Sequence, residues 1–196
     1  MLTIIEHPSP NHSPRPAGVR VDTVIIHHTA TSSDERGTRS AVGWLSATDS
    51  KASAHYVIGH DGRVYRLVQE DRTAWHAGES RFPWDTQKHK PGASLNPRSI
   101  GVELVNPGDG HTPFTEAQYR ALKELLRDIC ARRVMYGPSG GNVSVRPVDG
   151  LQPAHMTILG HRDVACFGNG RLGRKPDPAD NFDWDWVRAV LTARVA

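Results

Sequence analysis

The stretch VDTVIIHH, residues 21–28, has the composition of a buried β-strand that ends in two histidines. β-Branched residues dominate it, and side chains two positions apart lie on the same face of a strand. His27 therefore shares a face with Ile25, whereas His28 points to the opposite face. A lone histidine at the end of a buried strand is more often a hydrogen-bonded core residue than a ligand, so the role of His27 depends on the segments beside it.

A second stretch, SIGVELV at residues 99–105, predicts a strand with two unlike faces. The apolar face carries Ile100, Val102 and Leu104. The opposite face carries Ser99, Gly101 and Glu103. Because side chains alternate along a strand, the second face is small apart from one carboxylate. Such a face suits the floor of a groove.

Further strands and helices surround these two stretches. The other predicted strands are residues 54–59, 63–68 and 155–161, and the predicted helices are residues 34–48, residues 116–134 and a segment that begins after Asp183. The pair Asp61-Gly62 is a strong turn signal, so the first two of these strands form a hairpin and exclude an all-parallel sheet. The order predicts one α/β domain with a central mixed β-sheet flanked by helices. We expect residues 1–20 to form an N-terminal arm and residues 21–196 to form the domain.

Composition excludes several classes of function. The chain has 196 residues, of which 37% are hydrophobic, and a formal net charge of +3 without a run of lysine or arginine. We therefore expect a globular protein with no nucleic-acid partner. No segment approaches a membrane span and the N-terminus lacks the apolar run of a signal peptide, which predicts a cytoplasmic protein without membrane insertion. The two cysteines, Cys130 and Cys166, are too few for a disulfide framework. We also expect a monomer.

Two segments far from His27 supply further metal-binding groups. His161 ends the strand predicted at residues 155–161, and Asp177 lies in GRKPDP, residues 173–178. Two imidazoles and one carboxylate suit a zinc ion that keeps one coordination position open for water. A structural zinc usually has four protein ligands, so the predicted site is catalytic, at the ends of strands.

Six sequence blocks follow one another between residues 21 and 180. They are VIIHHTAT (24–31), SAHYVIGHDG (53–62), AWHAGES (74–80), RSIGVELVNP (98–107), ILGHRD (158–163) and GRKPDP (173–178). In this order the blocks resemble the type 2 family of zinc-dependent N-acetylmuramoyl-L-alanine amidases, which is related to the peptidoglycan recognition proteins. The resemblance implies a hydrolase that cleaves the amide bond between N-acetylmuramic acid and L-alanine in peptidoglycan or muropeptides.

The resemblance also implies roles for individual residues. The positions that match the zinc ligands are His27, His161 and Asp177. Glu103 matches the catalytic carboxylate, and Lys175 matches the lysine that assists the transition state. Trp75 and His76 fall in a block that lines the substrate groove. Cys166 is an alternative third ligand because some relatives use a cysteine there, but the RKPDP match favours Asp177.

Other functions and substrates have to be weighed against this interpretation. A catalytically inactive peptidoglycan-binding module would have no need of Glu103, and a generic zinc peptidase would carry the HExxH signature, which this chain lacks. The sequence leaves open whether the substrate is intact peptidoglycan or a soluble anhydro-muropeptide. It also leaves open whether the gene is cellular or belongs to a phage, whose endolysin would be released to the cell wall. Insertions at residues 81–97 and 137–154 could either lengthen the cleft or cover it.

Overall fold

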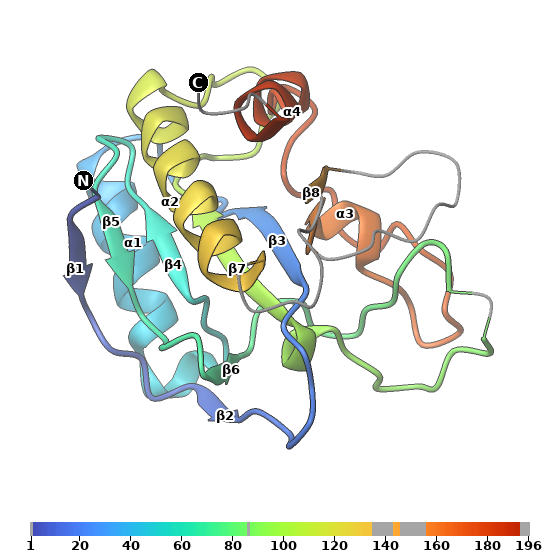
Figure 1. The fold of residues 1–196 in the computed structure, drawn as a ribbon. Helices are drawn as coiled ribbons and strands as arrows, with labels where there is room; N and C mark the ends of the chain where they lie inside the picture. Colours follow the sequence, from blue (N-terminus) through green and yellow to red (C-terminus); the bar gives the residue numbers. More distant parts are fainter. Residues whose placement is uncertain (1, 86, 135–142, 146–155, 193–196) are drawn as a thin grey trace.

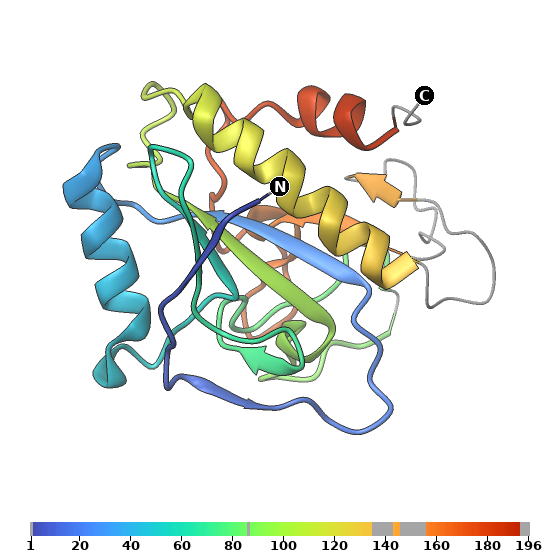
Figure 2. The same cartoon turned by 60° about the vertical axis from the view of Figure 1, so that its left-hand side comes forward.

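The computed structural model describes residues 2–85, 87–134, 143–145 and 156–192 (Figures 1 and 2). The main sheet has seven strands in the order β1-β5-β4-β7-β3-β9-β8. Its strands are β1 (Ile4–Glu6), β3 (Thr23–His28), β4 (Tyr56–Ile58), β5 (Val64–Arg66), β7 (Ser99–Leu104), β8 (Val143–Val145) and β9 (Met156–Gly160). A smaller sheet consists of β2 (His12–Pro14) and β6 (Arg72–Ala74). The helices are α1 (Glu35–Ser46), α2 (Glu116–Val134), α3 (His161–Val164) and α4 (Trp184–Thr192), with 3-10 turns at Thr48–Ser50 and Asn96–Arg98.

The predicted mixed sheet and its hairpin are confirmed. β4 and β5 pair antiparallel, whereas β4, β7, β3, β9 and β8 pair parallel with one another in that order. Gly62 in the hairpin turn has a φ of +82°, and a Cβ atom there would lie 2.6 Å from the carbonyl oxygen of Ala117. Glycine is therefore required both by the backbone conformation and by the close packing of the turn on α2.

Helices cover both faces of the main sheet, as Figures 1 and 2 show. α2 and α4 pack on one face, where buried side chains of β3, β4, β7 and β9 meet those of the two helices. A capping box begins α2: Thr115 Oγ1 accepts from the Gln118 backbone N–H, and the Gln118 side chain accepts from the Thr115 N–H. α1 packs on the opposite face with Ala41, Val42 and Leu45. Beside α1, Ile25 and Leu159 of the same face pack against a second group of buried residues, Ala77, Phe82, Leu95 and Val164.

The residues of the predicted N-terminal arm pair with both sheets. β1 runs parallel to β5 at the edge of the main sheet, and β2 runs antiparallel to β6. Between these strands and β3, the guanidinium of Arg15 donates to the carbonyl oxygens of Glu70, Pro97 and Ser99. The arm is thus attached to the strand that carries Glu103.

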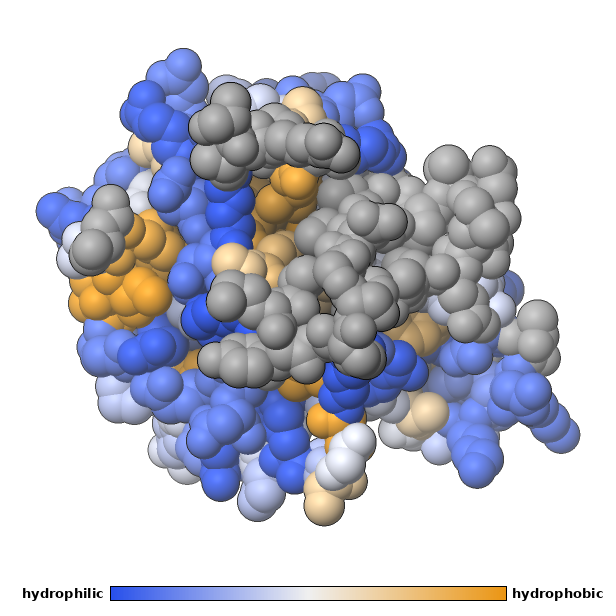
Figure 3. Space-filling view, viewed as in Figure 1, coloured by the Kyte–Doolittle hydropathy of each residue, from blue (hydrophilic) through white to orange (hydrophobic). Residues whose placement is uncertain are grey.

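The surface on the α2 side is mainly hydrophilic, with an apolar area over β1 (Figure 3), where Ile5 is 38% exposed. No helix within the described part of the chain is long and apolar enough to cross a bilayer. Of the predicted insertion at residues 137–154, only β8 lies within the described residues.

Candidate active site

Three neighbouring strands bring polar side chains to one level at their carboxyl ends. In the parallel pairing of β3 and β7, His27 lies opposite Glu103. β9 pairs with β3 up to the partners Ile26 and Gly160, so His161, the next residue, lies beside His27. Register partners in a parallel sheet point to the same face, and the row from His161 through His27 to Glu103 therefore faces the side on which α1 packs.

Asp177 reaches this row from the loop that follows α3. The Arg162 N–H donates to the Asp177 carbonyl oxygen over 2.6 Å, which holds the loop against α3. The peptide bond between Asp177 and Pro178 is cis. A Cβ atom on Gly160 would lie 2.8 Å from Pro178 Cδ, so only glycine at the end of β9 permits this approach.

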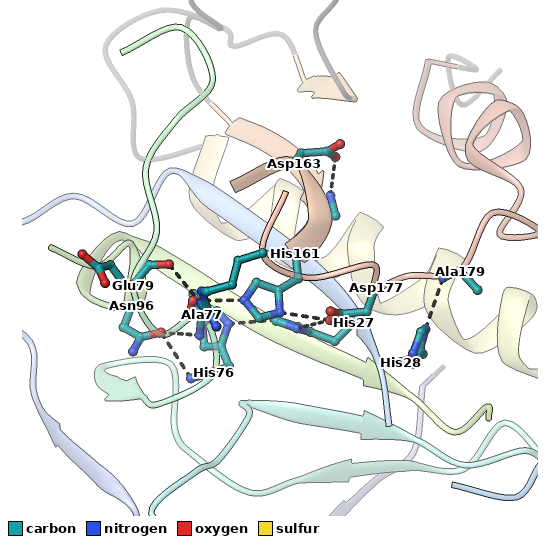
Figure 4. Close-up of polar contacts among 12 residues, drawn as sticks. His27, His28, His76, Ala77, Glu79, Asn96, His161, Asp163, Asp177 and Ala179 are labelled. Carbon is teal, nitrogen blue, oxygen red and sulfur yellow. Dashed lines mark hydrogen bonds and ion pairs between the residues drawn. The ribbon is translucent and has the colours of Figure 1, made fainter. Parts of the chain in front are cut away.

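The three predicted metal ligands converge on one point (Figure 4). The Nδ1 atoms of His27 and His161 lie 2.9 and 3.0 Å from the same oxygen, Oδ2 of Asp177. One donor atom of each residue lies within 4.8 Å of the other two, and all three residues are buried. Cys166, the alternative third ligand, is not part of this group; its Sγ contacts His89 Nε2 at 3.7 Å.

The charge states of these groups suit a metal ion. Burial, with repulsion from His161, lowers the pKa of His27 to about 4. Burial alone would raise the pKa of Asp177, but the close contacts of its Oδ2 with the imidazoles of His161 and His27 outweigh burial and hold that pKa well below its usual range. A neutral imidazole and an ionised carboxylate are the forms that bind metals. The donor set of two nitrogens and one oxygen fits zinc with a position left open.

The outer nitrogens of both histidines are held by one turn, at residues 76–77 (Figure 4). His27 Nε2 lies 3.0 Å from His76 Nδ1, and His161 Nε2 donates to the Ala77 carbonyl oxygen over 3.0 Å. Asn96 Oδ1 fixes the turn because it accepts from the N–H groups of His76 and Ala77. The structure thus places His76 behind a predicted ligand. Its predicted contact with substrate stays a prediction.

Glu103 lies beside the metal-binding group without belonging to it. Its Oε2 atom is buried and has no hydrogen-bond partner among the described residues. Burial and the negative charge of Asp177 raise the pKa of Glu103 to about 8, against the opposing charge of Lys175. Lys175 itself is exposed, two residues before Asp177. The carboxyl group is therefore poised to exchange a proton near neutral pH.

A pocket of about 370 Å³ opens next to Glu103. Its polar lining comprises Glu103, His28, Thr29, Thr31 and Ser40, and Trp44 of α1 borders it. The indole of Trp44 is 61% exposed. Sequence analysis missed this residue. A signal was present, because Trp44 lies off the buried stripe of α1 although tryptophan is rarely left in solvent.

The other predicted groove residue and the second histidine of the pair have different surroundings. Trp75 is 37% exposed, and its indole N–H donates to Ser13 in the N-terminal arm over 3.4 Å. His28 points away from the metal-binding group, as predicted, and its Nδ1 accepts from the Ala179 N–H. It therefore anchors the loop that carries Asp177.

Comparison with known proteins identifies this arrangement. The family model described as N-acetylmuramoyl-L-alanine amidase matches residues 17–180, which include the three predicted metal ligands and Glu103. The chain belongs to the N-acetylmuramoyl-L-alanine amidase family. This amidase hydrolyses the bond between N-acetylmuramic acid and L-alanine. Family membership favours the enzyme over the alternative of a catalytically inactive binding module.

Individual relatives agree with the family. The amidase is 29% identical over 198 residues to 1,6-anhydro-N-acetylmuramyl-L-alanine amidase AmpD of Enterobacter cloacae, covering 94% of this chain and 88% of that protein. It is 31% identical over 179 residues to the amidase AmiD of Escherichia coli, covering 84% of this chain but 51% of AmiD. A crystal structure of AmpD superposes with a TM-score of 0.63 at 22% identity, covering 98% of this chain and 99% of that one. AmiD in complex with anhydro-N-acetylmuramic acid-L-Ala-D-gamma-Glu-L-Lys gives a TM-score of 0.60 at 26% identity, covering 89% and 60%.

Proposed function

We propose that this amidase works with a zinc ion held by Nδ1 of His27, Nδ1 of His161 and a carboxylate oxygen of Asp177. The convergence of both Nδ1 atoms on Asp177 Oδ2 is the observation that carries the proposal. A zinc ion in such a site lowers the pKa of a bound water toward about 7 and polarises the carbonyl group of the scissile amide.

Glu103 moves the proton in this proposal. Its Oε2 has no partner to compete for the proton, and its position opposite His27 places it at the edge of the metal-binding group. The carboxylate takes a proton from the attacking water and delivers it to the nitrogen of L-alanine as the amide bond breaks. General acid–base transfer of this kind contributes roughly 100- to 10,000-fold in rate.

Lys175 stabilises the charge that develops on the amide oxygen. Its ammonium group is exposed and acts electrostatically on Glu103, so it lies on the open side of the site. A cation placed there favours the tetrahedral transition state over the neutral substrate.

The pocket beside Glu103 suits the saccharide side of the substrate. Its polar lining includes hydroxyl groups from Thr29, Thr31 and Ser40, and Glu103 is the only formally charged residue among the described ones that line it. A sugar ring offers hydroxyls to such partners and an apolar face to the Trp44 indole. The stem peptide, which carries carboxylates, lacks a cationic partner in this pocket. We therefore assign N-acetylmuramic acid to it.

We further propose that the enzyme accepts both intact peptidoglycan and soluble anhydro-muropeptides. The relatives support the anhydro form, since AmpD is named for it and AmiD was crystallised with an anhydro-muropeptide. The exposed position of Trp44 at the pocket leaves room for a longer glycan. The cytoplasmic location and the monomeric state stay predictions, and the origin of the gene, cellular or phage, stays open.

Two digestions performed in parallel test these proposals. Purified sacculi and a soluble anhydro-muropeptide are incubated with zinc-loaded and with chelator-treated enzyme, and new L-alanine amino groups are detected by mass spectrometry. We expect both substrates to be cleaved by the zinc-loaded enzyme alone. Full activity after removal of the metal would refute the zinc site. Cleavage confined to the anhydro form would refute the broad substrate range.

A further inference from the structure

The two histidines of the metal-binding group differ in what holds their outer nitrogen. His161 Nε2 lies 3.0 Å from the carbonyl oxygen of Ala77, which can only accept a hydrogen bond. The proton of the neutral ring is therefore held on Nε2, and Nδ1 presents its lone pair toward Asp177. His161 is preset for metal binding by this backbone contact alone.

His27 has no such fixed partner. Its Nε2 lies 3.0 Å from His76 Nδ1, and a neutral imidazole nitrogen can either donate or accept. The tautomer of His27 is therefore decided by the other side of the His76 ring, where Nε2 lies 3.1 Å from Ser99 Oγ. The Ser99 hydroxyl is also 2.8 Å from the carbonyl oxygen of Leu95.

This chain of contacts has two self-consistent settings. In the first, Ser99 donates to His76, His76 donates through Nδ1 to His27 Nε2, and His27 donates through Nδ1 to Asp177. In the second, every donor is reversed: His27 Nε2 donates to His76 Nδ1, His76 Nε2 donates to Ser99, and Ser99 donates to the Leu95 carbonyl. Each of the three side chains carries one proton in both settings, so the reversal changes two tautomers and one hydroxyl rotation without a change of charge.

Only the second setting leaves the Nδ1 lone pair of His27 free for a metal. We propose that metal loading reverses the hydrogen-bond chain from His27 through His76 to Ser99, with the Leu95 carbonyl as the terminal acceptor. Ser99 is then a positioning residue for His27, although it touches neither metal nor substrate. The inference rests on the proposed zinc site.

The packing around His76 prevents the ring from moving, so metal binding can change only the positions of its protons. A Cβ atom on Gly101 would lie 2.4 Å from His76 Cγ, so the imidazole rests directly on the backbone of β7. Asn96 holds the backbone N–H of His76, and Ser99 is fully buried. Because the ring has no room to turn away, a tautomer exchange is the available response to an incoming metal.

Zinc affinity measured by chelator competition tests the role of Ser99. Ser99→Ala leaves the Nε2–H of His76 without an acceptor in the loaded state, and we expect about tenfold weaker binding. His76→Asn places an amide oxygen near the position of Nδ1, where it accepts from His27, so affinity should stay within about threefold of the parent. In the His76→Asn background the chain to Ser99 no longer exists. Ser99→Ala should then have no further effect.

Ser80→Ala is the matched control. Ser80 is a buried serine whose hydroxyl accepts from the Leu95 N–H, so its loss perturbs the same segment without touching the chain. We expect its zinc affinity to match the parent. An equal loss from Ser99→Ala in both backgrounds would reduce Ser99 to a packing residue and overturn the inference.

Nitrogen-15 spectra of the histidines read the reversal directly. We expect the proton of His76 on Nδ1 in the metal-free protein and on Nε2 after zinc is added, with the proton of His161 on Nε2 in both. A His76 tautomer that does not respond to zinc would overturn this inference and leave the zinc site intact. Failure of the parent protein to bind zinc would overturn the proposed function together with the inference.

Discussion

The pKa values of two carboxyl groups in this site, those of Asp177 and Glu103, are shifted in opposite directions. Close contacts with the imidazoles of His161 and His27 hold the pKa of Asp177 well below its usual range, whereas burial and the charge of Asp177 raise the pKa of Glu103 to about 8. Carboxyl groups whose pKa values are driven apart commonly divide the labour of catalysis. In the proposed mechanism Asp177 remains ionised, as a ligand must, and Glu103 exchanges protons.

Glu103→Gln should therefore separate catalysis from metal binding. The amide preserves the shape of the side chain but cannot take a proton from water, so we expect turnover to fall at least about 100-fold with zinc bound as in the parent. Initial rates on a muropeptide and the zinc content per chain are the measurements. A glutamine variant with parental turnover would contradict the role of Glu103.

The raised pKa of Glu103 also predicts how the stability of the metal-free protein depends on pH. The folded state keeps the proton up to about pH 8, whereas a glutamate in the unfolded chain loses it near its ordinary pKa of 4.5. Between these values the unfolded chain binds fewer protons, so Glu103 lowers the free energy of unfolding as pH rises. Relative to Glu103→Gln, the parent should lose at least about 1 kcal/mol between pH 4.5 and 8. Urea denaturation of both metal-free proteins across this range measures the difference, and parallel curves would contradict the shift.

The choice between Asp177 and Cys166 as third ligand can be tested by replacing each. Asp177→Asn removes the charge at which both Nδ1 atoms converge and should abolish stoichiometric zinc binding, whereas Cys166→Ser, outside that group, should retain it. Metal analysis after dialysis distinguishes the two. Loss of zinc from the serine variant alone would restore Cys166 as the ligand.

Among the elements, strands were more predictable than the contacts between loops. Two-residue periodicity placed His27 on the functional face of β3 and Glu103 on that of β7, because alternation is local to the chain. The contact between His76 and His27 could not be read in the same way, since a turn after β6 brings them together across the sheet. The pairing of β1 with β5 was also not predicted from the sequence. A strand of three residues is too short for its side-chain pattern to indicate which strand it pairs with.

α1 supplies a prediction of its own through Trp44. If the indole stacks on the sugar ring, Trp44→Ala should raise KM roughly three- to tenfold with little change in kcat. Because the side chain is largely exposed, the free energy of unfolding should be almost unaffected. Trp75→Ala is the control, since Trp75 is a second exposed indole in a segment predicted from sequence to line the groove. A larger rise in KM for that variant would move the saccharide away from the α1 pocket.

For the whole molecule, the metal-binding group joins segments that are distant along the chain. His27 is the second-last residue of β3, His161 begins α3 and Asp177 lies in the loop beyond α3. A ligand that binds only the folded state stabilises it by mass action, about 2.7 kcal/mol at 100 times its dissociation constant. Zinc should therefore raise the melting temperature of the parent in a concentration-dependent way and leave that of His161→Ala unchanged. An equal rise in both proteins would place zinc elsewhere.

The order β7-β3-β9 in the main sheet also determines when the sheet can be completed during translation. β3 is translated well before β9, the strand that covers its second edge. His27 is likewise translated more than 130 residues before His161 and Asp177. A nascent chain that ends before β9 has neither the complete sheet nor the complete metal-binding group, so we expect a product terminated there to lack hydrolytic activity.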